Sequence, residues 1–162
     1  MWRKMKMRRA DREVTDFDGI IAIIKACDVM RLAMIDEAGE PYLVPLNFGW
    51  EIEDGQLRLY FHSAKEGRKL DILRQNPKVC FEMDTDHRLT PAEKPCGYSF
   101  GFKSVIGWGE VELLQTHEAK ARGLRAIMRH VGQPDAAFSS HDTQRVAVGV
   151  LRVKSLTAKK HA

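Results

Sequence analysis

The sequence predicts a mainly β protein whose six antiparallel strands form a closed or half-closed barrel. Strand-like segments are joined mostly by short turns, and only three segments have helical character. No GxGxxG motif follows a strand, and strands do not alternate with helices, so a Rossmann-type parallel sheet is excluded. The 162 residues, 44% of them apolar, are enough for one domain with a hydrophobic core.

A basic arm, residues 1–12, precedes the first regular element. It contains six cations and one acid, whereas the whole chain has a net charge of +4, so the remaining body is close to neutral. Such an arm can contact nucleic acid or anionic lipid, but a solvated arm, or one that packs on a partner subunit, is more common. We therefore expect one domain over residues 13–158, flanked by this arm and a basic tail at 159–162, with no nucleic-acid or membrane partner.

The first predicted helix begins at Thr15 or Asp16, since either side chain can accept a hydrogen bond from the first turn. Apolar residues recur on one face of this segment as far as Ala26. Residues 29–35 then have the composition of a strand, and Gly39 lies in the turn that follows.

The second predicted strand, residues 42–50, contains Pro45. Proline cannot donate to a ladder, so this strand belongs at a sheet edge or at an irregularity, and a ligand could take up the backbone there. Residues 53–55 form a hairpin turn into the third strand, 56–62, where apolar residues alternate.

A second helix is predicted at residues 64–75, ended by an Asn-Pro pair, and a fourth strand at 78–84. A polar loop over 85–97 leads into one long strand, 98–114, which we expect to bend near its paired glycines at 107 and 109. The last helix is expected at 116–130 and the sixth strand at 145–156.

Three cysteines, Cys27, Cys80 and Cys96, form no CxxC pair. This usage favours a reducing compartment over a disulfide framework or a zinc ribbon. The longest apolar stretches, such as residues 20–24, are too short to span a bilayer, and the N-terminus lacks the apolar stretch of a secretory signal. We therefore expect a cytoplasmic protein.

The most informative segment joins the end of the third strand to the second helix. Its Ser63 hydroxyl and the cations Lys65, Arg68 and Lys69 lie near a helix N-terminus, where unpaired N–H groups favour an anion. Cations there oppose the helix dipole unless an anion lies between them, which points to a phosphate. Alternatively, Ser63 and Glu66 have the spacing of a capping box, and the cations could be an ordinary solvated face.

His62 directly precedes this segment and could donate a proton to a bound substrate near neutral pH. The alternative is a structural histidine at a strand end. The other histidines that we considered have neither paired spacing nor an acidic partner at ligand spacing in the sequence, so we predict no metal site: His87, His117, His130 and His141.

Three runs resemble one known family. The run FHSAKEGRKLDIL followed by NPKVCFE resembles the FHxAxxGxKxDxL signature of the nitroimidazole-resistance proteins, which are FMN-binding split β-barrels of the pyridoxamine 5'-phosphate oxidase-like superfamily. Residues 42–51 (YLVPLNFGWE) and 102–114 (FKSVIGWGEVELL) resemble the same family, and the likeness covers about residues 10–157 in order and spacing.

The resemblance implies a six-stranded antiparallel split barrel that forms a homodimer with FMN at the subunit interface. The flavin-contacting strand would supply Pro45, Leu46, Asn47 and Phe48. The phosphate end would comprise His62, Ser63, Lys65 and Lys69, with Lys69 as the direct phosphate partner, and the long strand would add Ser104 and Val105. Without a ligand, Leu46, Phe48 and Val105 are core residues of any barrel, and Ser104 can satisfy a backbone group.

The implied activity is an FMN-dependent oxidoreductase that passes electrons from a reduced nicotinamide to a small oxidised molecule such as a nitroaromatic, with His62 as the catalytic side chain. A flavin carrier, store or redox sensor without turnover is the alternative, and a barrel that binds haem or a deazaflavin instead is a third. The C-terminal segment lacks the Arg-Leu-x-Pro ending of true pyridoxamine-phosphate oxidase, so vitamin B6 oxidation is not expected.

Overall fold

The computed structural model describes residues 3–4 and 7–161. Its strands are β1 (Arg3–Lys4), β2 (Glu13–Val14), β3 (Met30–Ile35), β4 (Pro41–Leu46), β5 (Gly49–Glu53), β6 (Gln56–Ser63), β7 (Lys78–Thr90), β8 (Ser99–Leu113) and β9 (Ala147–His161). Its helices are α1 (Phe17–Ala26), α2 (Arg68–Gln75), α3 (His117–His130) and α4 (Ser140–Gln144), with short 3-10 turns η1 (Ala10–Arg12) and η2 (Pro95–Gly97).

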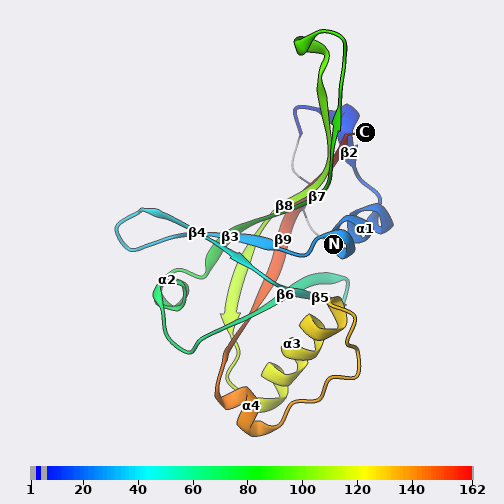
Figure 1. Ribbon diagram of the computed structural model, residues 1–162. Helices are drawn as coiled ribbons and strands as arrows, with labels where there is room; N and C mark the ends of the chain where they lie inside the picture. Colours follow the sequence, from blue (N-terminus) through cyan, green and yellow to red (C-terminus); the bar gives the residue numbers. More distant parts are fainter. Residues whose placement is uncertain (1–2, 5–6, 162) are drawn as a thin grey trace.

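The strands form one sheet in the order β4-β3-β7-β8-β9-β6-β5, in which all neighbours are antiparallel. The short strands β1 and β2 pair with β9, β1 in parallel and β2 antiparallel. The β7–β8 hairpin extends far beyond the body, whereas α3 and α4 lie at the opposite end (Figure 1). Among the described residues, no helix has the length and hydropathy needed to cross a bilayer.

The mainly β antiparallel prediction is confirmed, but the prediction of six strands is too low. The expected strand 42–50 breaks into β4 and β5, because α3 packs directly on Gly49. A Cβ at Gly49 would lie 2.2 Å from the backbone of Ala126, so only glycine allows this approach. Two further short strands, β1 in the arm and β2 directly after it, add to the count.

Other boundaries differ as well. The second helix begins at Arg68 rather than at residue 64, and α4 was not predicted. Strand β9 runs on to His161, so most of the expected basic tail is strand, while Ala162 and arm residues 1–2 and 5–6 lie outside the described residues.

The core fills the barrel with large side chains that pack over glycines on neighbouring strands. Phe81 lies opposite Gly107 and Phe61 opposite Gly149 in the strand register, and both phenylalanines are fully buried. A Cβ at either glycine would lie 2.4 Å from the facing ring, so the missing side chains make room for the rings. The expected bend in β8 is a register shift between Trp108 and Gly109.

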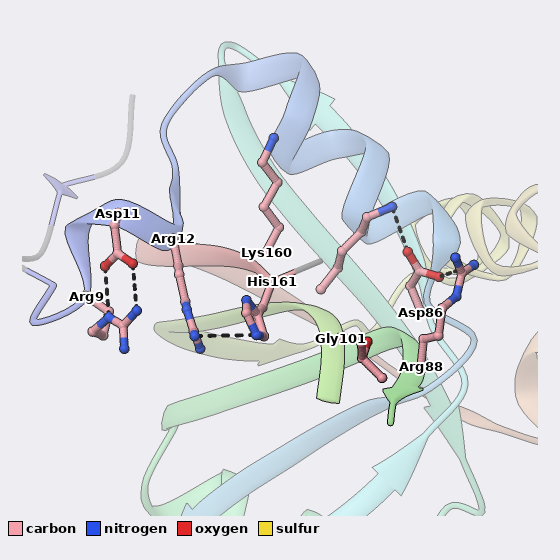
Figure 2. Close-up of a pocket in the computed structure, with 10 residues that line it drawn as sticks. Arg9, Asp11, Arg12, Asp86, Arg88, Gly101, Lys160 and His161 are labelled. Atoms are coloured by element: carbon pink, nitrogen blue, oxygen red, sulfur yellow. Dashed lines mark hydrogen bonds and ion pairs between the residues drawn. The ribbon is translucent and has the colours of Figure 1, made fainter. Parts of the chain in front are cut away.

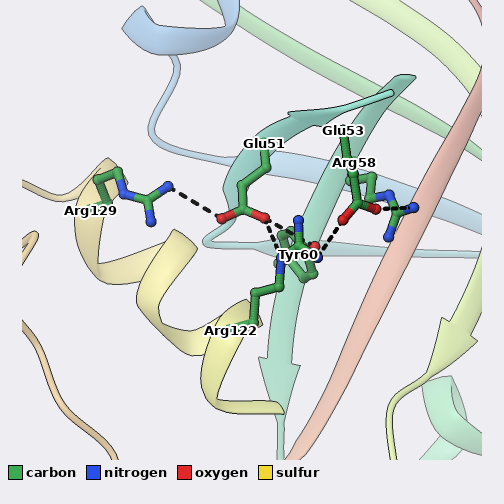
Figure 3. Close-up of polar contacts among 6 residues, drawn as sticks. All are labelled: Glu51, Glu53, Arg58, Tyr60, Arg122 and Arg129. Atoms are coloured by element: carbon green, nitrogen blue, oxygen red, sulfur yellow. Dashed lines mark hydrogen bonds and ion pairs between the residues drawn. The ribbon is translucent and has the colours of Figure 1, made fainter. Parts of the chain in front are cut away.

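A network of charged side chains fastens α3 to the β5–β6 hairpin (Figure 3). The guanidinium of Arg122 donates from Nε to Glu51 Oε2 at 2.8 Å and from Nη1 to Glu53 Oε1 at 2.5 Å. Arg129 also donates to Glu51, and Arg58 pairs with Glu53 from the strand side. The bond from Arg122 holds the pKa of Glu53 below its usual value, with Arg58 adding to the effect.

We predict that Arg122→Gln lowers the melting temperature by about 3–6 °C, because losing charge-assisted bonds to two carboxylates costs ~1–2 kcal/mol at a partly exposed site. Thermal unfolding followed by circular dichroism measures this. The control is Arg125→Gln on the same helix, an exposed arginine that forms no ion pair with any described residue.

The pH dependence provides a second check. A carboxylate whose folded pKa is depressed stabilises the fold above its unfolded pKa and loses this contribution as the pH falls through the folded value. The difference between wild type and Arg122→Gln should therefore shrink below about pH 4.5, the ordinary value for Glu53. A difference that stays constant down to pH 3 would show that Arg122 acts by packing alone.

Candidate functional site

A small cavity of about 250 Å³ lies where β6 gives way to α2, facing β4. Tyr42 and Val44 of β4 line one side. The opposite side is the connection after β6 and the first turn of α2, from Ser63 to Leu70. The cavity therefore brings together Ser63 and Lys69, two of the predicted phosphate residues.

Lys69 is the distinctive side chain of this cavity. Its ammonium lies 5.8 Å from the ring centroid of Phe61, and the residue is half-buried. Burial lowers the pKa of Lys69 below its usual value, and no nearby carboxylate counteracts this. Among the described residues, no acidic partner for Lys69 is found, so the site holds a partly desolvated positive charge that an anion would stabilise.

The start of α2 is open. Its N-cap is Gly67, with φ at 138°, a conformation that other residues rarely adopt, and no side chain caps the helix. The Ser63 hydroxyl instead donates to the carbonyl of Ala64, so the Ser63–Glu66 capping box is not formed. In the first turn, Leu70 donates to the Gly67 carbonyl at 2.9 Å. Within the described residues, the N–H groups of Arg68 and Lys69 are left for water or a ligand.

The neighbouring cations have different roles. Arg68 is held by the Asp36 carboxylate at 3.2 Å and stacks on Tyr42, with its guanidinium carbon 4.6 Å from the ring centroid. Lys65 is exposed and does not line the cavity. Tyr42 and Asp36 were not among the predicted site residues, although the alternation along β4 could have placed Tyr42 on the same face as Val44 and Leu46.

His62 lies in a different cavity. Its neighbour Phe61 points into the barrel, so His62 points to the other face of β6, toward α3 and α4. There it lines a largely apolar cavity of about 560 Å³ with Leu124 and Phe138. Arg145 adds a positive charge at the same place. Within one chain, His62 is therefore separated from the Ser63–Lys69 cavity by the strand itself.

The residues matching the flavin strand occupy the end of β4 and the link to β5. Pro45 is exposed on the edge strand, as the sequence predicted, and Leu46 packs against the core. The Asn47 amide donates to the carbonyl of Asp28 at 3.2 Å. Phe48 is fully buried with its ring 4.5 Å from that of His130, so only its backbone could meet a ligand.

The two residues of the long strand lie on opposite faces of the sheet. Val105 is fully buried, as expected if it is a core residue of the barrel and not a ligand contact. Ser104 is half-buried and lies opposite Asp84 in the register, on the outer face that also carries Pro45. The predicted site residues therefore lie in four separate places: the Ser63–Lys69 cavity, the His62 cavity, the core and the outer face of the sheet.

Three of the four histidines considered for a metal have hydrogen-bond partners, and His141 is exposed on α4. His130 bonds the carbonyl of Cys27 at 2.8 Å, and His117 bonds Thr143 at 2.9 Å. His87 does have an acidic partner, Asp84, at 2.7 Å. In the part of the chain that the structure describes, no cluster of three His, Cys, Asp or Glu side chains could hold a metal.

The cysteines divide by burial. Cys27 is a core residue, and burial raises the pKa of its thiol to about 12. Cys80 is only half-buried. Its register partners Ala33 and Trp108 face outward, which places Cys80 on the outer face of β7. Cys96 is exposed in the turn between β7 and β8.

The sequence model of the pyridoxamine 5'-phosphate oxidase family matches residues 16–160. The chain belongs to this pyridoxamine 5'-phosphate oxidase-like family. The match covers the barrel and both cavities, and it confirms the resemblance found from the three sequence runs. No curated protein sequence matched the chain.

Solved structures agree with this family assignment. A proposed 5-nitroimidazole antibiotic resistance protein from Bacteroides thetaiotaomicron is 33% identical, with a TM-score of 0.79 over 91% of this chain and 86% of that one. An FAD- and haem-binding protein from Mycobacterium smegmatis is 17% identical, with a TM-score of 0.78 over 92% and 73%. An FAD-binding protein from Mesorhizobium loti is 21% identical, with a TM-score of 0.64 over 93% and 98%. The split-barrel fold is thereby confirmed.

We predict that Lys69→Met raises the melting temperature of the ligand-free protein by about 1–3 °C, because it replaces a partly desolvated ammonium with an apolar side chain of similar length. Differential scanning calorimetry without flavin measures this. Lys65→Met is the control and should change nothing, since Lys65 is exposed. A lower melting temperature for Lys69→Met would mean that the ammonium is already stabilised by the fold.

Proposed function

We propose that this pyridoxamine 5'-phosphate oxidase-like protein binds FMN and that the flavin phosphate occupies the cavity between β4 and α2. The observation that carries the proposal is Lys69, a half-buried cation to which no described residue offers a carboxylate, beside a helix N-terminus that no side chain caps. A phosphate there would accept hydrogen bonds from N–H groups of the first helical turn and a charge-assisted hydrogen bond from the Lys69 ammonium. Relatives described as FAD-binding support a flavin ligand. We propose FMN because this flavin nucleotide carries a single phosphate, which suits a single cavity of this kind.

We further propose a homodimer that joins the outer faces of the sheet. Four apolar side chains on this face are unusually exposed for a single chain: Ile35 (45%), Leu43 (58%), Ile106 (38%) and Trp108 (37%). The register places Leu43 in one row with Trp108, and Pro45 in the next row with Ile106. Apolar surface of this kind on a sheet face marks an association surface.

The dimer would also explain why the residues assigned to the flavin do not converge within one chain. Pro45 and Ser104 share the outer face with two strands between them, while Ser63 and Lys69 lie in the cavity behind the edge strand. A ring lying between two outer faces could contact residues from both subunits.

The reaction that we propose is electron transfer from a reduced nicotinamide to a small oxidised molecule of nitroaromatic type. The flavin would supply the redox chemistry, and the protein would bind and orient it and exclude water. The likeness to the Bacteroides protein, 33% identical, supports the nitroaromatic class of substrate. A cytoplasmic location, where reduced nicotinamides are available, belongs to the same proposal.

The position of His62 favours a second candidate, a flavin carrier or sensor without turnover. His62 faces α3 and α4 rather than the Ser63–Lys69 cavity, so it meets the flavin only if the dimer brings the ring to that side. Reduced nicotinamide consumption by the FMN-loaded protein separates the two candidates. Turnover that His62→Ala reduces, with FMN affinity unchanged, supports the enzyme.

We predict that Lys69→Ala weakens FMN binding by about 10–100-fold, because the phosphate loses a charge-assisted contact worth ~1.5–3 kcal/mol. Quenching of flavin fluorescence on titration measures the affinity. Lys65→Ala, an exposed lysine four residues earlier, is the matched control and should leave the affinity unchanged. Unaltered affinity in Lys69→Ala would place the phosphate elsewhere.

We predict that Trp108→Glu turns a dimer into a monomer and releases bound FMN, because a buried, unpaired carboxylate would face the partner's apolar surface. Sedimentation measures the mass against the 18.5 kDa of one chain. Val131→Glu is the control, since Val131 is also exposed but lies at the end of α3. A wild-type protein that sediments as a monomer contradicts the proposed interface.

A further inference from the structure

A second, strongly basic recess lies far from the cavities described above. It has a volume of about 730 Å³ and is enclosed by η1 of the arm, the lower part of the β7–β8 hairpin and the C-terminal end of β9. Figure 2 shows arm residues on one side, Asp86 and Arg88 of the hairpin on the other, and His161 between them. Three segments that are distant in sequence therefore build one site.

The lining of this recess is positively charged. Five cations line it, against two carboxylates: Arg9, Arg12, Arg88, Lys103 and Lys160, with Asp11 and Asp86. The excess of cations is concentrated here although the body of the protein is close to neutral, so the recess is a local feature and not part of a uniformly basic surface.

Both carboxylates are already engaged. Asp11 accepts two bonds from Arg9, at 2.8 and 2.7 Å. Asp86 pairs with Lys103 at 3.0 Å and with Arg88 at 3.9 Å.

Two cations of the recess remain uncompensated. Within residues 3–4 and 7–161, neither Arg12 nor Lys160 has a carboxylate partner. The nearest polar neighbour of the Arg12 guanidinium is His161, whose Nε2 lies 3.4 Å away and also contacts the Ser99 hydroxyl at 2.8 Å.

The strand register brings two of these cations face to face. Lys103 of β8 and Lys160 of β9 are direct cross-strand partners, and both line the recess. Like charges directly opposite each other destabilise a sheet. Asp86 compensates Lys103 but not Lys160, so an anion beside Lys160 would relieve the remaining repulsion.

We propose that this recess binds a small anion with two or more phosphate groups, such as the diphosphate part of a nucleotide. Arg12 and Lys160 would contact the phosphates, while Asp11 holds Arg9, and Asp86 holds Lys103 and Arg88, in position around them. The volume is in the range of small-ligand sites. A compact recess with a near-neutral body around it favours a small ligand over nucleic acid, which needs cations spread along a groove.

The recess is distinct from the proposed flavin site. None of the residues assigned to the flavin lines it. Lys103 is adjacent to Ser104 in the chain, but successive residues of a strand point to opposite faces. Failure of the flavin proposal therefore leaves this one untouched, and the reverse also holds.

The test is binding of inorganic pyrophosphate and of ATP to the 162-residue protein, with and without added FMN, measured by calorimetry at about 0.15 M ionic strength. The variant Arg12→Gln/Lys160→Gln should weaken both ligands by about tenfold or more, because two charge-assisted contacts are lost. The matched control is Lys78→Gln/Arg125→Gln, which removes one lysine and one arginine that are exposed and lie outside the recess. The control should keep wild-type affinity.

The shift in melting temperature on adding pyrophosphate tests binding even where the double variant is less stable than the wild type. Pyrophosphate should raise the melting temperature of the wild type and of the control but not of Arg12→Gln/Lys160→Gln. The proposal is overturned if pyrophosphate and ATP fail to bind, if both variants lose affinity equally, or if pyrophosphate displaces FMN. It is also overturned if a single-stranded oligonucleotide binds the recess more tightly than ATP does.

Discussion

The arrangement of this molecule depends on how one edge of β9 is divided. Strand β8 pairs with the other edge over nearly its whole length, from Leu113 opposite Gly149 to Phe102 opposite His161. The remaining edge pairs with β6 as far as Arg152, and the short strands β2 and β1 take over beyond it. Between the two regions, Lys154 has no partner in the β8 register, and the carbonyl of Arg152 lies so close to Gly109 that a Cβ there would be 2.1 Å away. This bulge adds twist where the edge changes partners. As a result, β6 can end at Ser63 beside α2, while the far end of β9 is left for the arm and the basic recess.

Much of the fold could be predicted because it follows from local rules. The capping residues Asp16 and Thr116, the Asp-Gly turn before β6 and the long strand β8 all lie where the sequence indicated. The predictions fail where a segment distant in the sequence determines the local backbone structure. The break at Gly49 is imposed by α3, whose residues come some seventy positions later in the chain.

The second helix illustrates a local ambiguity. Ser63 and Glu66 have capping-box spacing, but Gly67 adopts a backbone conformation that other residues avoid and becomes the N-cap itself. The sequence could not decide between these two starts, because the register of β6 with β9, which carries Ser63 into the strand, is a tertiary interaction. Ser139 and Asp142 form a real capping box, and that spacing could have revealed α4.

The candidate site was predicted less completely than the fold. A motif in the sequence groups neighbours such as His62, Ser63 and Lys69, whereas a strand sends successive side chains to opposite faces. Ser63 and Lys69 therefore share a cavity, and His62 lies on the other side of β6. The cluster of Arg12, Lys103 and Lys160 had no signal at all, because three unrelated segments contribute to it.

The two proposed anion sites differ in how strongly their charges are exposed to water, and they should therefore respond differently to salt. Lys69 is half-buried and lacks an acidic partner, so an anion beside it is attracted in a medium of low dielectric constant that salt penetrates poorly. The recess works by crowding like charges at a surface where Arg9, Arg88 and Lys160 are exposed. Attraction between exposed charges is screened within about 10 Å at 0.1 M salt. Raising the ionic strength should therefore weaken phosphate binding in the recess steeply and leave FMN binding much less affected, so the salt dependence alone identifies which site a phosphate ligand occupies.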